Sequence, residues 1–118
     1  MSANSKYVRV TKSMITSKAW RELDTFDKVA YMHFKLEYNG TKQEVKLPYK
    51  DMEGVMSRDR FTKSIDNLLR VGLIDIVHHR PQMRDATIYG MSSRWHKYGE
   101  DGFIKRQRPS LKRRRPEP

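Results

Sequence analysis

The sequence predicts an α+β fold in which helices precede a short antiparallel hairpin. Residues 57–71 place apolar side chains at i, i+4, i+7 and i+8 from Phe61, the stripe of a helix with one buried face. Gly72 ends this segment, and two apolar runs follow at 73–77 and 87–91. At 118 residues the chain is long enough for one domain with a single modest core.

We expect residues 1–6 to be a flexible N-terminus and the domain to begin at residue 7. Apolar residues on one helical face predict a first helix within 13–23: Ile15, Ala19, Trp20 and Leu23. Thr25 is the expected cap of a second helix, and Asp27 suits the positive end of its dipole. The buried face of this helix is predicted to hold Phe26, Val29, Ala30, His33 and Leu36, and Asn39-Gly40 should end it.

Alternation across 42–49 predicts a half-buried strand, which Pro48 restricts to an edge. A short helix is predicted at 48–53, followed by a turn at Gly54. Ser57 is then a good N-cap for the helix that ends at Val71.

The two apolar runs after Gly72 predict a hairpin whose connecting loop, 78–86, is too long for a tight turn. A last short helix is expected at 92–99, with Trp95 and Tyr98 packing on the body. This order is the layout of a winged helix-turn-helix: a three-helix core, a β-hairpin wing and short flanking helices. We therefore expect a winged-helix domain at 7–99 and a disordered basic tail at 100–118.

The net charge of +11 favours a polyanionic partner such as nucleic acid. Residues 103–118 contribute seven Lys/Arg and one Glu, so the remaining body is also basic. The absence of cysteine fits a reducing compartment, and neither an N-terminal signal peptide nor a long apolar run is found. We expect a cytoplasmic protein, associated with the nucleoid if its source is prokaryotic.

The first candidate site is the exposed side of the helix at 57–71. In helix-turn-helix docking, residues near the N-terminus of the second helix contact base edges or phosphates. With Phe61 facing inward, Asn67 points outward and Arg60 and Thr62 lie on the flanks. The predicted DNA contacts are Ser57, Arg58, Arg60, Thr62, Lys63 and Asn67. The competing interpretation is a solvated face of mixed charge, which Asp59 and Asp66 favour.

The loop at 78–86 is the candidate wing, with contacts predicted for His79, Arg80, Gln82 and Arg84. A plain surface hairpin and a metal site are the alternatives. Adjacent histidines on a strand point to opposite faces and chelate one ion poorly, so we expect no metal or other cofactor.

No phosphate-binding loop, HExxH or GxSxG motif is present, and we expect no enzymatic activity. His33 lies on an apolar face, where a structural role is commoner than general-base catalysis. The aromatic residues at core-like spacing are expected to pack inside, not to stack on bases: Trp20, Phe26, Phe34, Phe61 and Trp95.

The tail is expected to add nonspecific phosphate affinity through Lys105, Arg106, Arg108, Lys112, Arg113, Arg114 and Arg115. Its composition also resembles a nuclear localisation signal, the less favoured alternative.

Three passages resemble small winged-helix proteins of phages, plasmids and other mobile elements, including the N-terminal domains of replication initiators and related regulators. They are 17–23, the Asn39-Gly40 pair, and 56–61 leading to the Gly-Leu-Ile-Asp junction at 72–75. The resemblance covers residues 7–98 and implies a recognition helix at 57–71 and a wing at 78–86. An initiator usually carries a further domain, so the resemblance favours a regulator or accessory protein.

The leading hypothesis is a non-catalytic binder of double-stranded DNA, acting in transcription regulation or replication. Its alternative is a protein-interaction module whose basic tail alone binds nucleic acid. RNA binding is permitted by the charge and disfavoured by the lack of an exposed aromatic platform. A homodimer on paired half-sites and a protein partner are both compatible with the sequence, and membrane association is not expected.

Overall fold

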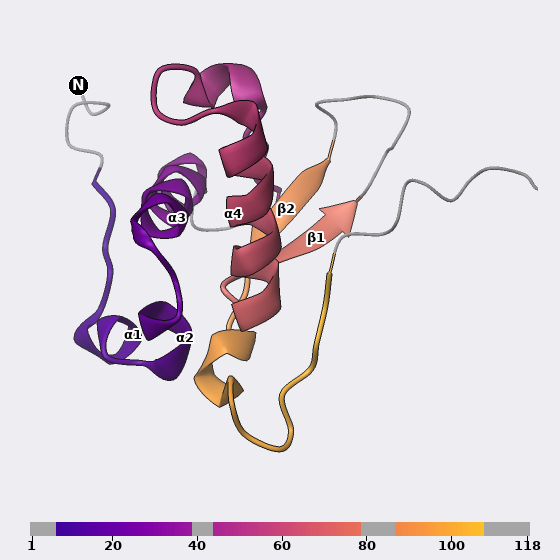
Figure 1. Cartoon of the computed structure of the whole chain (residues 1–118). Helices are drawn as coiled ribbons and strands as arrows, with labels where there is room; N and C mark the ends of the chain where they lie inside the picture. Colours follow the sequence, from indigo (N-terminus) through magenta and orange to yellow (C-terminus); the bar gives the residue numbers. More distant parts are fainter. Residues whose placement is uncertain (1–6, 39–43, 79–86, 108–118) are drawn as a thin grey trace, which may run out of the picture.

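The computed structural model describes residues 7–38, 44–78 and 87–107, which form an α+β domain (Figure 1). Its α-helices are α1 (Lys12–Ile15), α2 (Lys18–Arg21), α3 (Thr25–Glu37) and α4 (Arg58–Val71). Two 3-10 helices, η2 (Tyr49–Met52) and η3 (Arg94–Lys97), flank α4 and the hairpin of β1 (Ile74–His78) and β2 (Ile88–Met91). The predicted α+β class is therefore confirmed.

The single helix predicted within 13–23 is wrong, because the chain breaks into α1 and α2. Ser17 makes the break: its hydroxyl accepts a hydrogen bond from the Trp20 amide at 3.1 Å and donates one to the Met14 carbonyl at 2.6 Å. Such a side-chain bond starts a new helix in place of continuing the old one. Met14 and Trp20 are buried, whereas Ile15, expected on the apolar face, is 48% exposed.

Helix α3 is capped one residue earlier than predicted, since Asp24 is the N-cap in place of Thr25. The Asp27 amide donates to Asp24 at 2.9 Å, and the Asp24 amide donates to Asp27 at 3.2 Å. This reciprocal pair is a capping box with an aspartate in the usual glutamate position.

The buried face of α3 is also rotated from the predicted one. It holds Asp27, Ala30, Tyr31 and Phe34, while Phe26 is 45% exposed. Phe34 explains the rotation, because its ring lies between those of Phe61 (6.2 Å) and Tyr89 (5.0 Å). Stacked and edge-to-face aromatic pairs at these distances stabilise a core beyond their buried area.

The predicted strand at 42–49 is reduced, among its described residues, to one bridge. Val45 and Tyr89 exchange two backbone hydrogen bonds of 2.8 Å. The predicted alternation holds, because Val45 and Leu47 are buried and Glu44 and Lys46 are exposed. This bridge places the segment before η2 beside β2, at the edge opposite β1.

Helix α4 and the hairpin follow the sequence prediction closely. Ser57 caps α4, and Gly72 terminates it at φ +89°. β1 pairs antiparallel with β2 in the register Ile74 to Met91, with an irregularity after Ile76. The core lies between α3, α4 and this hairpin, and Leu68 and Ile74 are fully buried within it.

Arg94 joins the end of α4 to β1 and to the chain that follows η3. Its guanidinium pairs with Asp75 at 2.7 Å and donates to the carbonyls of Leu69 (2.9 Å), Ile74 (3.1 Å) and Ile104 (2.7 Å). A cation is favourable at the carbonyl end of a helix. Through Ile104, Arg94 also contacts a residue that we predicted to belong to the tail. The predicted flexible N-terminus at 1–6, the Asn39-Gly40 pair expected to end the second helix, residues 79–86 of the predicted wing and residues 108–118 of the predicted tail lie outside the described residues.

We predict that Gly72→Ala destabilises the domain much more than Gly54→Ala. Both glycines have positive φ, so each alanine costs about 1–2 kcal/mol of backbone strain. A Cβ on Gly72 would also meet the Trp95 backbone nitrogen at 2.8 Å, whereas none lies within 4 Å at Gly54. Urea denaturation should give a difference of at least about 1 kcal/mol, and equal destabilisation by the two variants would contradict this packing.

Tyr31 provides a prediction about alkaline pH, because burial raises its pKa from 10.0 to about 12. Between these values the unfolded chain loses the phenolic proton and the folded chain keeps it. Stability is therefore fully present below pH 10 and falls as the pH rises through 12. The free energy of unfolding of the Tyr31→Phe variant should therefore fall by about 2 kcal/mol less between about pH 9 and 12, as measured by denaturation at each pH. Parallel curves for the two proteins would contradict the assignment.

Candidate nucleic-acid interface

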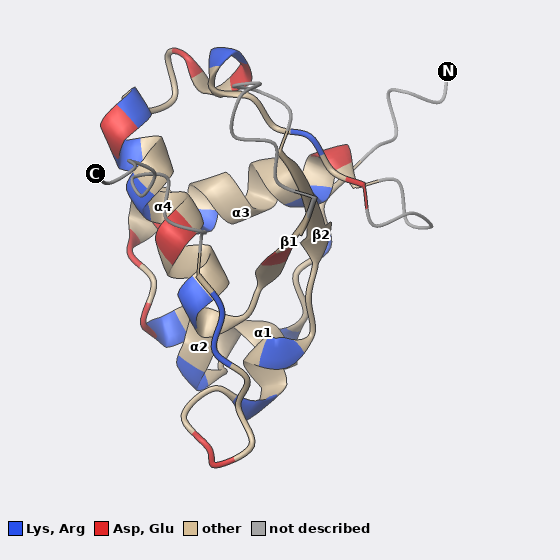
Figure 2. Cartoon of the chain, turned by 90° about the vertical axis from the view of Figure 1, so that its right-hand side faces the viewer, with Lys and Arg blue, Asp and Glu red and all other residues tan. Residues whose placement is uncertain are grey.

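The outer ridge of α4 alternates in charge. Asp59, Lys63, Asp66 and Arg70 follow one another at intervals of three or four residues, on the side opposite the buried Phe61. Figure 2 shows blue and red alternating along this helix. The net charge of the ridge is zero, so this ridge has little long-range attraction for a polyanion. The ridge presents an alternating row of hydrogen-bond donors and acceptors.

Two exposed cations, Arg58 and Lys63, lie in the first half of α4, whereas Arg60 is half-buried. Arg58 is exposed, and its guanidinium lies 4.6 Å from the Tyr49 ring centroid, which orients it beside η2. Lys63 is exposed five residues further along, and Thr62 is half-buried. Ser57 is exposed, but its hydroxyl already accepts a hydrogen bond from the Arg60 amide at 3.1 Å.

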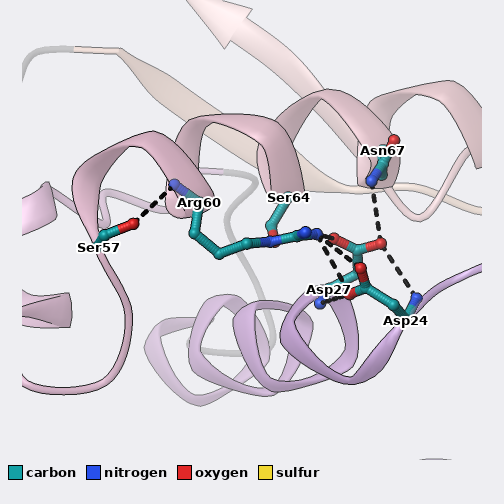
Figure 3. A network of polar contacts seen from close by, with 6 residues as sticks. All are labelled: Asp24, Asp27, Ser57, Arg60, Ser64 and Asn67. Carbon is teal, nitrogen blue, oxygen red and sulfur yellow. Dashed lines mark hydrogen bonds and ion pairs between the residues drawn. The ribbon is translucent and has the colours of Figure 1, made fainter.

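Arg60 turns toward α3 and not toward solvent (Figure 3). Its guanidinium pairs with Asp27 at 2.7 Å and with Asp24 at 2.9 Å. The Phe26 ring covers it at 5.2 Å. A base or phosphate contact by Arg60 would therefore have to compete with two carboxylates.

Asp27 is the centre of this network, with 1% of its surface exposed. Its second carboxylate oxygen accepts a hydrogen bond of 3.0 Å from the Asn67 amide, as Figure 3 shows. Asn67, which we expected to point outward, is thus directed toward α3. The physical reason is that a buried carboxylate is costly unless it is paired and hydrogen-bonded, and α4 supplies both groups.

The same network acts on Asp24. Partial burial raises the pKa of its carboxyl, but the Asp27 amide hydrogen bond and the Arg60 charge outweigh it, so the pKa lies below its ordinary value. Asp24 and Asp27 therefore both pair with Arg60 and both cap the start of α3. The polar network joins the two longest helices of the described chain.

A second polar network closes the other end of α4. The Arg70 guanidinium donates to the Tyr98 hydroxyl at 2.8 Å and pairs with Glu22 at 3.4 Å, while Tyr98 donates to Glu22 at 2.9 Å. The Tyr98 hydrogen bond holds the pKa of Glu22 below its ordinary value, with further lowering from Arg70 and Lys18 against partial desolvation. This contact fixes the end of α2 and the chain after η3 beside the outer ridge.

The remaining predicted contacts are mostly outside the described residues. These are His79, Arg80, Gln82 and Arg84 of the wing and Arg108, Lys112, Arg113, Arg114 and Arg115 of the tail. Lys105 and Arg106 are described and exposed, and Arg106 lies 3.8 Å from Asp75. Asp75 is already paired with Arg94, so it neutralises Arg106 incompletely.

A basic segment at 7–21 was not predicted from the sequence. The described residues carry sixteen Lys/Arg and twelve Asp/Glu, a net charge of +4, and the other residues carry +7. All of that +4 belongs to this segment, in the exposed residues Arg9, Lys12, Lys18 and Arg21. The signal that could have revealed it was the order of charges, because the first acidic residue of the chain is Glu22.

Within the three described ranges, no three His, Asp or Glu side chains are grouped so that they could hold a metal ion. None of the helices there is long and apolar enough to cross a bilayer. Comparison of the chain with protein-family models, with curated proteins and with solved structures finds no match.

We predict that Arg60→Met destabilises the domain by about 2–4 kcal/mol, because it leaves the buried Asp27 without its counter-charge. The matched control, Arg58→Met on the exposed start of α4, should change stability by less than about 1 kcal/mol. Urea denaturation measures both variants.

The Asp27→Asn substitution supplies the cross-check. In the Arg60→Met background a neutral amide no longer needs the guanidinium, so the double variant should be more stable than Arg60→Met alone. Additive destabilisation by the two substitutions would show that Arg60 and Asp27 do not act as a pair.

Proposed function

We propose that this protein is a non-catalytic binder of double-stranded DNA with a winged-helix architecture. The observation that carries the proposal is the arrangement around α4. A short helical turn, η2, precedes α4, and an antiparallel hairpin follows directly after Gly72. The Val45 to Tyr89 bridge adds a third backbone segment beside that hairpin. In chain order, the flanking segment, the short helical turn, the longer helix and the hairpin are the layout of a winged helix.

The chemistry of the exposed residues supports a nucleic-acid partner. Arg58 and Lys63 lie in the first half of α4, the part that reaches base edges and phosphates when such a helix enters the major groove. Arg60 and Asn67 fit a different role in this proposal. They hold α4 against α3, which presets the orientation in which Arg58 and Lys63 meet DNA.

The uneven distribution of charge suggests that different parts of the chain supply affinity and discrimination. The ridge of α4 has no net charge, while the residues outside the described ranges add +7, most of it in the predicted wing and tail. We infer that α4 discriminates among sequences and that the wing and tail supply much of the salt-dependent affinity. A transcription regulator or a replication accessory protein in the cytoplasm, acting as a monomer or on paired half-sites as a dimer, fits this division.

One observation favours a second candidate function. The alternating ridge Asp59, Lys63, Asp66 and Arg70 is as well suited to a protein surface of complementary charge as to DNA. In that case the domain is a protein-interaction module, and only the basic tail attracts nucleic acid.

We predict that Arg58→Gln combined with Lys63→Gln weakens binding to a selected DNA site by about 1–3 kcal/mol per base contact and relaxes sequence preference. Lys46→Gln with Lys50→Gln removes the same charge from exposed positions outside α4 and should change preference little. The site is first selected from a random oligonucleotide pool at near-physiological salt, and affinities are measured by fluorescence anisotropy.

The tail is tested in the whole chain by changing Arg108, Lys112, Arg113, Arg114 and Arg115 to glutamine. DNA binding that disappears in this variant, together with no effect of the α4 substitutions relative to their control, would support the protein-interaction module. Weak binding that is insensitive to salt in every variant would contradict both functions.

A further inference from the structure

We propose that the segment 7–21 is a second phosphate-binding surface, which contacts the DNA backbone flanking the groove that α4 enters. This inference rests on the proposed function and goes beyond it, because these residues belong to neither the predicted recognition helix nor the wing. It assigns a role to the residues that carry the entire net charge of the described chain.

The charge of the described chain is concentrated in this segment. Outside 7–21 the described residues hold twelve basic and twelve acidic side chains, whereas 7–21 holds four basic residues and no acid. Arg9, Lys12, Lys18 and Arg21 are all exposed, and none is in an ion pair with another described residue. Figure 2 shows the blue ribbon gathered around α1 and α2. A surface that served only to keep the protein soluble could carry acidic and basic residues together, so it would not explain why 7–21 holds no Asp or Glu.

The segment is also held rigidly on the domain. Met14, Ala19 and Trp20 anchor α1 and α2 in the core, and Trp20 packs edge-on against Tyr31 of α3 at 5.7 Å. Lys12, Lys18 and Arg21 are therefore carried by two short helices fixed to the domain. Presenting charges on a fixed scaffold lowers the entropy that binding must overcome.

The C-terminal end of α4 lies next to this segment. Glu22, at the end of α2, meets Arg70 on the outer ridge of α4. Lys18 lies one turn earlier on α2, and its side chain runs along Gly99, where an added Cβ would come within 2.7 Å of the Lys18 Cδ. Lys18 is therefore beside the C-terminal end of the outer ridge.

The length of α4 makes this position suitable for the DNA backbone. A helix of 14 residues is about 20 Å long, while the major groove is about 12 Å wide. When the first half of α4 lies in the groove, its last turns lie over the flanking phosphates. Lys18 and its neighbours extend the protein surface there, with ammonium and guanidinium groups suited to phosphate oxygens.

The test compares two triple variants of the whole chain that remove the same charge. The surface variant is Lys12→Gln, Lys18→Gln and Arg21→Gln, and the control is Lys35→Gln, Lys46→Gln and Lys50→Gln. Binding to a labelled duplex of about 20 base pairs and mixed sequence is followed by anisotropy between about 50 and 200 mM salt. Circular dichroism and thermal unfolding verify the fold, and the three single variants replace the triple one if it unfolds.

We expect the surface variant to reduce the slope of log K against log salt by about 2.7, which is about 0.9 for each phosphate that is no longer neutralised. Affinity at about 100 mM salt should fall more than roughly tenfold, and the control should change the slope by less than about one. Equal slopes in the two variants, with binding still sensitive to Arg58→Gln and Lys63→Gln, would overturn this inference and leave the proposed function standing. Absence of duplex binding by the unmodified protein would overturn both. If the surface variant lost affinity for polyglutamate but kept its affinity for DNA, this inference would be overturned and the surface would be assigned to an acidic protein.

Discussion

A single buried carboxylate, that of Asp27, controls how the two longest helices of this domain meet. It is almost completely removed from solvent, and it receives a guanidinium from Arg60 and an amide from Asn67, both on α4. A carboxylate in that position is stable only while these partners stay in place. The orientation of α4 on α3 therefore depends on a directional polar contact as well as on packing. The positions of the exposed residues of α4 depend on this orientation.

Contacts of two further arginines, Arg70 and Arg94, fix the C-terminal end of α4. At its C-terminal end, Arg70 meets Glu22 and Tyr98, which attaches α2 and the chain after η3. Arg94 donates to the Leu69 carbonyl in the last turn of α4 and to the carbonyls of Ile74 in β1 and Ile104. Because each arginine makes more than one contact, α4 is held at its start and at its end. The exposed cations of the domain are consequently displayed on one scaffold.

The separation of structural from accessible arginines changes how the candidate interface is understood. Arg60 and Arg58 are two residues apart, yet one is paired with α3 and the other lies exposed over Tyr49. In our proposal Arg60 fixes the orientation of α4, and Arg58 contacts the DNA in that orientation. Net charge is located elsewhere, in 7–21 and in the residues beyond the described ranges. Affinity and discrimination would then be properties of different parts of the chain.

Helix α4, its Ser57 cap, the Gly72 terminator and the two strands were predictable because each depends on local spacing or on one residue type. The predictions that failed depended on competing or distant contacts. The break at Ser17 competes locally with helix continuation, and periodicity alone does not reveal which of the two is preferred. The face of α3 was rotated because Phe34 packs between Phe61 and Tyr89, residues far away in the sequence.

The amino-acid sequence by itself thus determined the order and type of the main elements, together with the charge that favours a polyanionic partner. Only the tertiary structure decided which polar residues serve the interior. Asp27 has the sequence context of an exposed dipole residue, and Arg60 and Asn67 that of contact residues. Their pairing arises only when α3 and α4 pack and exclude water from the carboxylate. The reason is physical: the cost of burying a charge depends on groups that folding alone brings within hydrogen-bonding distance.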